Sequence, residues 1–260
     1  MPPEPETVLI TGASSGIGRE LAMLFAENGS NLVLVARGLD KLGDLSRTIR
    51  DRRSVRVDVF SKDLAERGSA ESLDAELRSA GLPIDVLVNN AGFGAYGPFE
   101  EIDLDRQRQV IQLNVLALTE LCRLLLPGMR QRRRGGILNV ASTAAFQPGP
   151  FMAVYYATKA YVLSFTEALA EELSGGPVTA TCLCPGPTRT GFAAEAEMES
   201  TPLFQKFAMD AAEVAREGYR GFRAGKRLVV VGFSNRMGAF STRLVPRPVA
   251  AKLVRALHGR

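Results

Sequence analysis

Residues 7–18 read TVLITGASSGIG, and this stretch predicts the class of fold. It opens with a short β-branched and apolar run, which is typical of a buried strand, and a helical pattern follows it. Gly12, Gly16 and Gly18 lie between the two, in the spacing G-x-x-x-G-x-G. A first glycine permits a tight turn, a second lets the backbone approach a pyrophosphate, and a third allows close helix packing. The stretch therefore predicts a nucleotide-binding turn, with a ligand-free Gly/Ser turn as the alternative.

The same alternation of strand and helix continues along the chain. Apolar runs predict further strands at residues 31–36, 54–59, 84–88, 137–140, 177–183 and 227–231. Helical patterns separate them, so the connections are right-handed crossovers and the strands are parallel. We predict a single-domain doubly wound Rossmann fold, an α/β class, with a seven-stranded parallel sheet flanked by helices on both faces. Ligands of such sheets collect at the carboxyl ends of the strands.

Polar residues follow the second, third and fourth predicted strands. Arg37 stands just past the second strand, where an acidic residue selects NAD and an arginine accommodates the 2′-phosphate of NADP. Lys41 supports NADP(H), whereas Asp40 is the main argument for NAD(H). Asp63 and Asn90 come after the third and fourth strands, at the same edge of the predicted sheet.

Residues 136–159, GILNVASTAAFQPGPFMAVYYATK, carry the candidate acid/base chemistry. Tyr155 and Lys159 are four apart, so on a helix they share one face. An ammonium near a phenol favours the phenolate, and we therefore expect Lys159 to lower the pKa of Tyr155. Ser142, at the tip of a strand, is placed to hold a carbonyl or hydroxyl oxygen. Tyr156 lies three residues from Lys159 and is the competing tyrosine.

Composition limits the chemistry. The 260 residues are 46% hydrophobic and 23% charged with a net charge of +4, as in an ordinary globular protein. The only histidine is His258, which argues against His-dependent triads and His-rich metal sites, and we predict no metal. The arginine run at 130–134 is interpreted as a solvated helix end, not a nucleic-acid site. The three cysteines form no C-x-x-C pair. Because the sequence also shows no secretory signal, we predict a cytoplasmic protein.

Residues 1–260 are predicted to form one domain, with a core at 7–233. Residues 188–206 lack clear periodicity and are interpreted as a substrate lid. Residues 234–260 form a C-terminal extension in which 246–258 have a basic amphipathic helical pattern. This helix has four alternative placements: over the active site, against a partner subunit, on a membrane surface, or packed loosely on the protein. No segment has about 18 uninterrupted apolar residues, so no integral membrane segment is predicted.

The motifs together resemble the short-chain dehydrogenase/reductase family, in the short single-domain branch with TGxxxGxG and YxxxK. The resemblance covers about residues 7–233. The run NNAGFGAYGPF at 89–99 is similar to bacterial members near the 3-oxoacyl and 17β-hydroxysteroid reductases. The resemblance implies a catalytic tetrad of Asn114, Ser142, Tyr155 and Lys159. It also implies cofactor-binding residues, which are Gly12, Ser14, Ser15, Gly16, Ile17, Gly18, Arg37, Asp63, Leu64, Asn90, Ala91, Gly92, Tyr155, Lys159, Pro185, Gly186 and Thr188.

In that family scheme Tyr155 protonates a carbonyl oxygen or deprotonates an alcohol while hydride passes to or from the nicotinamide. Ser142 holds the reacting oxygen, Lys159 lowers the proton affinity of the tyrosine and binds the ribose, and Asn114 anchors a water that links Lys159 to solvent. The implied activity is an NADP(H)-dependent oxidoreductase acting on a ketone or aldehyde and its alcohol, as a reductase of an apolar substrate. The alternatives are a catalytically silent NADP(H)-binding regulator and a sugar-nucleotide epimerase or dehydratase.

The predicted partners are a small carbonyl or alcohol substrate and further copies of the chain, as a homodimer or homotetramer. The resemblance places the pairing surface on the predicted helices at 104–129 and 152–173. Four aromatic residues are candidates for an apolar substrate pocket: Phe93, Tyr96, Phe146 and Phe192.

Overall fold

The structure is a computed structural model that describes residues 5–192 and 208–258. Its centre is a seven-stranded sheet in the order β3-β2-β1-β4-β5-β6-β7, with every pairing parallel. The predicted doubly wound fold is confirmed. The chain reverses its direction of winding between β1 and β4, so this fold places its ligand crevice outside their carboxyl ends. The strands are β1 (Thr7–Thr11), β2 (Asn31–Ala36), β3 (Val57–Ser61), β4 (Val86–Asn89), β5 (Gly135–Val140), β6 (Val178–Cys184) and β7 (Leu228–Val230).

The third strand differs most from its predicted bounds. It begins at Val57, not at residue 54, because pairing with β2 sets its register from Leu32 opposite Val57 to Ala36 opposite Ser61. The next helix does not follow this strand directly. A turn occupies that place, with the Asp63 carboxylate accepting from the amide of Ala65 at 2.9 Å, and the next helix begins only after Gly68, whose φ is 75°.

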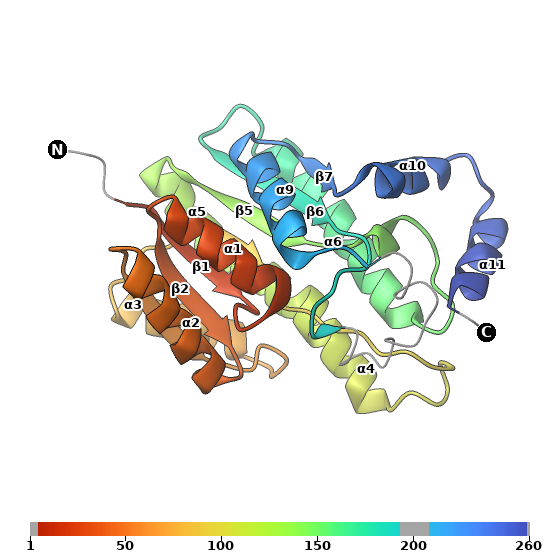
Figure 1. The fold of residues 1–260 in the computed structure, drawn as a ribbon, viewed down its shortest axis with the longest axis horizontal. Coiled ribbons are helices and arrows are strands. Elements are labelled where there is room, and N and C mark those ends of the chain that lie inside the picture. The colour runs from red at the N-terminus through yellow and green to blue at the C-terminus, as the bar shows by residue number, and fades with distance from the viewer. Residues whose placement is uncertain (1–4, 193–207, 259–260) are drawn as a thin grey trace.

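Helices cover both faces of the sheet (Figure 1). One apolar core joins the sheet to α1, α2 and α9, and a second core joins the opposite face to α3, α5 and α6. Each of these helices buries one stripe of side chains against the strands. The bounds are α1 (Gly16–Glu27), α2 (Leu39–Arg52), α3 (Ser69–Ser79), α4 (Leu104–Ile111), α5 (Leu118–Arg132), α6 (Ala153–Glu172) and α9 (Ala211–Arg223).

The long helix expected at 104–129 is continuous but irregular. A π-helical segment, η1 (Gln112–Ala117), separates α4 from α5. Across Leu104–Arg132 the helix is long and apolar enough to cross a membrane by length and composition, and 44% of its most apolar window is buried in the protein. Core helices pass the same test, and α5 buries Leu121 and Met129 against the sheet. The absence of an integral membrane segment stays a prediction.

The arginine run at the end of α5 contacts a buried carboxylate. Asp85 precedes β4 and accepts from Arg132 at 3.1 Å, from Arg134 at 2.5 Å and from the amide of Thr7 at 3.1 Å. Burial alone raises the pKa of Asp85, but the hydrogen bonds from Arg134, Thr7 and Arg132 outweigh it and hold the pKa below its usual value. Arg132 and Arg134 are thus structural, because they neutralise the buried carboxylate of Asp85 next to the start of β4.

After β7 the chain leaves the sheet as two further helices, α10 (Phe233–Ser241) and α11 (Arg247–Leu257). The sequence pattern had predicted the second of them and missed the first. In Figure 1 they form the right-hand edge of the molecule, and α11 descends beside the start of α6. The predicted lid lies largely outside the described residues, which resume at residue 208.

Candidate active site

A cleft of about 690 Å³ lies at the carboxyl ends of the strands. It receives residues from the loops after β1, β2, β3, β4, β5 and β6, and from the N-terminal half of α6. Gly18 and Asn114 are the two predicted site residues that lie behind its wall. The predicted residues that line the cleft are Gly12, Ser14, Ser15, Gly16, Ile17, Arg37, Asp63, Leu64, Asn90, Ala91, Gly92, Ser142, Tyr155, Lys159, Pro185, Gly186 and Thr188.

The glycine loop is shaped by close backbone approach. Gly12 has φ +65°, and a Cβ there would lie 2.8 Å from Nδ2 of Asn90. Gly16 has φ +53° and starts α1, whose first turn holds no acidic residue. A positive φ is strained for any side chain except hydrogen, so both positions require glycine. The resulting loop leaves the amide groups of the α1 N-terminus facing the cleft, an arrangement that suits a phosphate.

Gly18 lies beneath this loop. A Cβ on Gly18 would lie 2.5 Å from the carbonyl oxygen of Gly12 and closer still to Nδ2 of Asn90. Asn90 donates to the carbonyl oxygens of Thr11 and Gly12, at 3.0 and 3.2 Å, while the Thr11 hydroxyl accepts from the amides of Asn90 and Ala91 at 3.0 Å. The ends of β1 and β4 are thereby tied together. Asn90 was predicted to bind the cofactor, and the structure gives it this contact, which holds the glycine loop, as well.

The far end of the cleft carries the charges predicted to select the cofactor. Arg37 is the first residue after β2, and Asp40 and Lys41 from the first turn of α2 line the same wall. Both the arginine that favours NADP(H) and the carboxylate that favours NAD(H) are therefore present. Lys62, which sequence reasoning missed, also lines this end and forms an ion pair with Glu76 at 2.5 Å.

Ser142, Tyr155 and Lys159 meet at the other end of the cleft. Ser142 follows β5, and its side chain hydrogen-bonds that of Tyr155. The Lys159 ammonium lies 5.8 Å from the centre of the Tyr155 ring and donates to the carbonyl oxygen of Val140 at 2.8 Å. Helix α6 presents tyrosine and lysine on one face, as the four-residue spacing predicts, and β5 supplies the serine beside them.

The expected lowering of the Tyr155 pKa is wrong for this arrangement. Burial raises the pKa of Tyr155 to about 12, and the hydrogen bond with Ser142 offsets only part of that rise. Burial also lowers the pKa of Lys159 to about 8, with the nearby thiols of Cys182 and Cys184 acting in the opposite direction. Desolvation of a buried phenol is thus a larger effect here than the ammonium, which lies beyond hydrogen-bonding contact with the ring. Tyr155 consequently holds its proton at neutral pH.

Asn114 lies behind Gly92, in the π-helical segment η1. Its amide donates to the carbonyl oxygen of Phe93 at 3.0 Å and to the hydroxyl of Thr158 at 3.1 Å, and its oxygen accepts from the amide of Phe93 at 3.2 Å. A Cβ on Gly92 would lie 3.0 Å from Oδ1 of Asn114 and 3.4 Å from Nζ of Lys159. The side chain is 1% exposed and hydrogen-bonded through both of its polar atoms, so it braces the loop after β4 against α6. Its predicted role in a water path stays a prediction.

Tyr156 has a different environment from Tyr155. It is 7% exposed, and its hydroxyl lies 3.2 Å from Nε2 of His258. Nδ1 of His258 lies 2.8 Å from the carbonyl oxygen of Pro150, which can only accept, so Nδ1 carries the proton and Nε2 accepts from Tyr156. The hydroxyl of Tyr156 is therefore occupied by the C-terminus of α11, which supports Tyr155 as the acid/base residue.

His258 fastens α11 over the cleft. It is 1% exposed, and its own carbonyl oxygen accepts from the hydroxyl of Tyr96 at 2.8 Å. Val254, one turn earlier, packs into a cluster with Met152 and Tyr156. Of the alternatives for residues 246–258, the structure shows the helix covering the active site. Other cleft-lining residues escaped sequence reasoning because no motif marks them, among them Met152, Thr190, Gly191, Val254 and Leu257.

The four aromatic candidates for the substrate pocket divide into two pairs. Phe93 and Phe192 line the cleft, and the ring of Phe192 lies 5.1 Å from that of Tyr155. Tyr96 packs instead against Phe151 and His258, and Phe146 packs against the core on the α6 side of the sheet. Their placement depends on the path of the loops after β4, β5 and β6, which no local pattern encodes.

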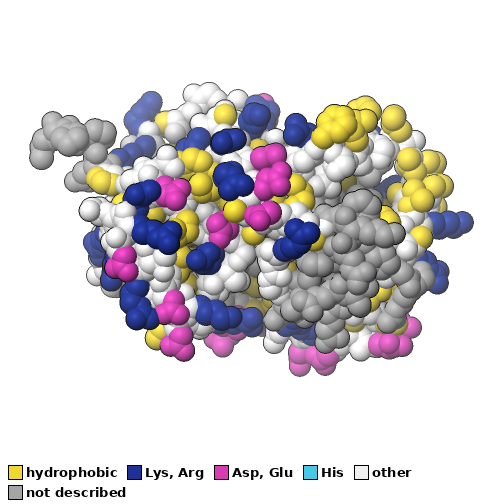
Figure 2. Space-filling view, viewed as in Figure 1, with side chains coloured by type: hydrophobic (Ala, Val, Ile, Leu, Met, Phe, Trp, Pro, Cys, Tyr) yellow, Lys and Arg dark blue, Asp and Glu magenta, His cyan; other side chains and the backbone are white. Residues whose placement is uncertain are grey.

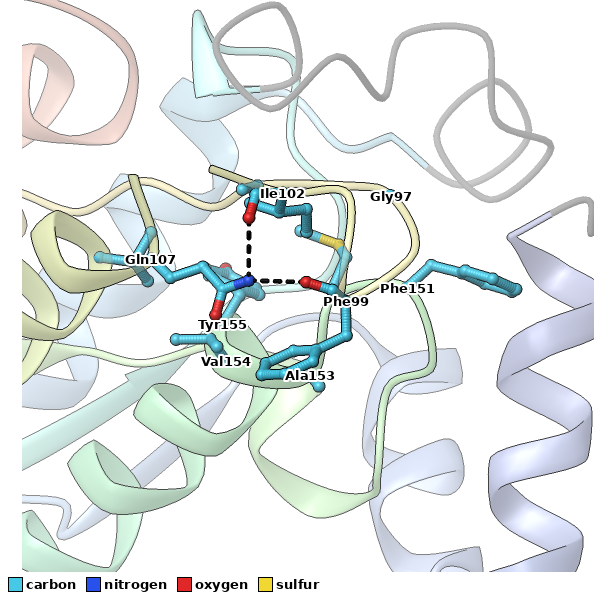
Figure 3. Close-up of a pocket in the computed structure, with 11 residues that line it drawn as sticks. Gly97, Phe99, Ile102, Gln107, Phe151, Ala153, Val154 and Tyr155 are labelled. Carbon is cyan, nitrogen blue, oxygen red and sulfur yellow. Dashed lines mark hydrogen bonds between the residues drawn. The ribbon is translucent and has the colours of Figure 1, made fainter. Parts of the chain in front are cut away.

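A second, much smaller pocket adjoins the start of α6 (Figure 3). Its volume is about 20 Å³, which holds about one water molecule. Figure 3 shows the Gln107 amide from α4 donating to the carbonyl oxygens of Phe99 and Ile102, at 2.9 and 3.4 Å. The Gln107 amide thus holds the loop after β4 in place. The pocket itself is too small for a substrate.

Acidification is expected to loosen α11. Burial lowers the pKa of His258 from its ordinary value of 6.5, although the Pro150 carbonyl acts in the opposite direction. The neutral ring therefore stabilises the folded state fully above pH 6.5. This stabilisation is lost as the pH falls from 6.5 through the lower pKa that His258 has in the folded protein. We expect the difference in melting temperature between wild type and His258→Leu to narrow between about pH 8 and pH 5. A difference independent of pH contradicts the assignment.

Comparison with known proteins agrees with this geometry. The profile of the family described as short chain dehydrogenase matches residues 6–200. The very-long-chain 3-oxoacyl-CoA reductase of Rattus norvegicus is 38% identical over 171 residues, which are 64% of this chain and 54% of that protein. The chain therefore spans about half the length of such curated relatives.

Solved structures cover more of the chain. A short-chain dehydrogenase from Sphingobium yanoikuyae in complex with NADPH is 32% identical, with a TM-score of 0.82 over 92% of this chain and 93% of that one. A short-chain dehydrogenase/reductase from Burkholderia phymatum in complex with NAD is 26% identical, with a TM-score of 0.81 over 92% and 95%. The chain belongs to the short-chain dehydrogenase/reductase family.

Proposed function

We propose that the chain is an NADP(H)-dependent oxidoreductase that reduces an apolar ketone or aldehyde to its alcohol, with Tyr155 as the general acid. One observation carries the proposal. Tyr155, Ser142 and Lys159 share a single cleft with the glycine loop and Arg37, and the cleft has room for a dinucleotide and a substrate together.

The residues present fit a nicotinamide dinucleotide. The turn at Gly12 and Gly16 leaves no space for a side chain, and the α1 N-terminus offers amide donors for the pyrophosphate. Ser14 and Arg37 would hold a 2′-phosphate, Asp63 and Leu64 the adenine, and Lys159 the nicotinamide ribose. The relative in complex with NADPH and the one in complex with NAD support a nicotinamide cofactor without distinguishing the two. When bound, that cofactor supplies or accepts the hydride.

The protein's own groups handle the proton. Because burial keeps the Tyr155 phenol protonated, it can donate to a carbonyl oxygen as negative charge develops there. The Ser142 hydroxyl, which hydrogen-bonds Tyr155, is placed to donate to the same oxygen. The Lys159 ammonium adds positive charge beside the pair and favours the tyrosinate left after transfer. A tyrosine that starts protonated suits the direction of reduction.

An apolar substrate is proposed from the wall opposite the glycine loop. Phe93, Met152, Phe192, Val254 and Leu257 line this part of the cleft. The relative from Rattus norvegicus is a very-long-chain 3-oxoacyl-CoA reductase, whose name also denotes a long apolar substrate. These two observations support an apolar carbonyl compound without naming it.

The function is tested by following NADPH oxidation by the purified chain with ketosteroids, 3-oxoacyl thioesters, aromatic ketones and aldehydes. We expect turnover with at least one apolar class and little with small polar carbonyls. NADPH binding measured by fluorescence, combined with no turnover on any class, supports the catalytically silent regulator instead. Absence of NADPH binding overturns both.

The choice of NADP(H) is tested separately by Arg37→Asp. A carboxylate there repels a 2′-phosphate and accepts from a 2′-hydroxyl, so we expect NADPH to bind at least about tenfold more weakly while NADH changes little. Arg53→Asp, at the other end of α2, is the matched control for the change of charge. Equal weakening of both cofactors contradicts the proposed preference.

Assembly and compartment are also proposals. Helices α4 to α6 carry exposed apolar side chains on the predicted pairing surface, among them Leu116 at 45% and Tyr161 at 38%. Tyr161 stacks on Phe165 with ring centres 5.7 Å apart, which gives a flat apolar area suited to a second copy. All three cysteines are buried thiols, in keeping with the proposed cytoplasmic location.

A further inference from the structure

Helices α10 and α11 expose a large apolar surface. Phe233 is 76% exposed, and Met237 and Phe240 follow it on one face of α10 at 52% and 55%. Within the part of the chain that the structure describes, α10 buries none of its own side chains. The exposed apolar residues of this α10–α11 surface are Phe233, Met237, Phe240, Leu244, Val249, Leu253 and Leu257.

The exposed stripe of α11 belongs to a helix that is held firmly in place. Ala250 and Val254 are 8% exposed and face the protein, and His258 anchors the C-terminal end. Val249 and Leu253, at spacing i and i+4, lie beside that buried arc and remain 46% and 58% exposed. The rest of the protein thus covers only part of the apolar face of α11. Because the helix is anchored, loose packing or fraying does not explain why the remaining apolar residues are exposed.

Only cations accompany these apolar residues in the sequence. The last acidic residue of the chain is Glu217, before either helix begins. The exposed cations of the segment are Arg236, Arg243, Arg247, Lys252 and Arg255. Figure 2 shows hydrophobic side chains gathered over α10 and α11 at one edge of the molecule, with Lys and Arg side chains beside them. Apolar patches of this kind, bordered by charge of one sign, mark interaction sites.

We propose that the α10–α11 surface docks on an anionic lipid membrane. Aromatic and aliphatic side chains such as Phe233 and Leu244 would enter the boundary between headgroups and acyl chains, while the arginines and Lys252 contact lipid phosphates. A second copy of the chain is the other candidate occupant. A symmetric contact brings the same surface together twice, so it would place like charges opposite one another. An anionic bilayer instead matches both the apolar and the cationic part of the surface.

The docked face adjoins the cleft. Leu257 is 41% exposed and also lines the cleft, and Val254 lines it from the same helix. The inner side of α11 is thus a wall of the cleft, and its outer side belongs to the docking surface. The proposal goes beyond the reductase activity and does not depend on it, because membrane binding needs neither cofactor nor turnover.

The test is sedimentation of the full chain with vesicles, compared between phosphatidylcholine alone and equal parts phosphatidylcholine and phosphatidylglycerol. We expect binding to the anionic vesicles only. It should fall steeply in about 1 M NaCl, where the Debye length shrinks to about 3 Å. The double variant Phe233→Ser/Leu244→Ser should lower the bound fraction at least about tenfold, because it removes the two most exposed apolar side chains of the surface. Arg243→Gln/Lys252→Gln should lower it on anionic vesicles.

The matched control is Phe99→Ser/Leu39→Ser. It makes the same chemical change at residues that are 61% and 59% exposed and lie outside α10 and α11, in the loop after β4 and at the start of α2, and it should leave vesicle binding unchanged. The proposal is overturned if Phe233→Ser/Leu244→Ser and Phe99→Ser/Leu39→Ser lose vesicle binding equally, or if wild type does not bind vesicles. The mass in solution without lipid is measured by analytical ultracentrifugation. If wild type does not bind vesicles and Phe233→Ser/Leu244→Ser lowers the mass of the protein in solution, the surface joins copies of the chain.

Discussion

Tyr155→Phe is expected to lower kcat/KM for carbonyl reduction by about 10²- to 10⁴-fold, the range that one general acid contributes. The substitution removes only the hydroxyl, which is the proton donor in the proposed reaction and the partner of Ser142. The ring keeps its contact with Phe192, so the folded structure and the cleft should survive. Turnover is measured by NADPH oxidation on the best substrate of the panel, and retained folding by thermal unfolding.

Tyr156→Phe is the matched control, since it removes the same atom from the next residue. It deletes the hydrogen bond to His258 while leaving the Ser142–Tyr155 pair intact. We expect turnover within a few-fold of wild type and a lower melting temperature, because Nε2 of His258 loses its buried partner. If the Tyr156 variant is the inactive one, the assignment of the acid is reversed. If both variants turn over normally, neither tyrosine is the proton donor.

Gly18→Ala has the second largest expected effect. The added methyl would meet the carbonyl oxygen of Gly12 at 2.5 Å and the Asn90 side chain that holds the glycine loop. A backbone oxygen cannot move without its loop, so we expect the free energy of unfolding to fall by about 1–3 kcal/mol, as in other overpacked sites. The displaced loop should also bind NADPH at least about tenfold more weakly. Thermal unfolding without cofactor and a fluorescence titration measure the two effects.

Gly43→Ala controls for helix propensity. Gly43 is also inside a helix, and a Cβ there would meet nothing within 4 Å. Replacing it should stabilise the protein by about 0.4–1 kcal/mol and leave NADPH binding unchanged. The difference between the two glycine variants isolates the contact under the loop. Similar behaviour of the pair would show that the loop adjusts to a methyl group, and the close-packing role of Gly18 would be wrong.

The spacing of residues explains why so much of the site was predictable. Local backbone geometry sets the positions of Gly12, Gly16 and Gly18. The pitch of one helix sets those of Tyr155 and Lys159. Arg37 follows its strand directly, and parallel strands bring their carboxyl ends to one edge. These features depend on neighbours in the sequence or on a single rule of topology, so they survive without knowledge of loop paths.

Features that depend on distant contacts were missed or misjudged. The π-helical turn that carries Asn114 arises within a stretch whose composition suits an ordinary α-helix. The pKa of Tyr155 depends on how much protein surrounds it, and that burial reverses the direction expected from Lys159. His258 is separated from Pro150 by 108 positions, so no sequence pattern links them.

The sequence by itself determined the doubly wound sheet and the glycine loop, and it predicted the acid/base residues, because strand period, helix pitch and backbone freedom are local properties. Only the tertiary structure decided which tyrosine faces Ser142, and that burial keeps its phenol protonated. It also decided that α11 covers the cleft on one side and exposes Val249 and Leu253 on the other. These outcomes depend on which surfaces meet after the chain has folded, since burial and desolvation are properties of the whole packed molecule.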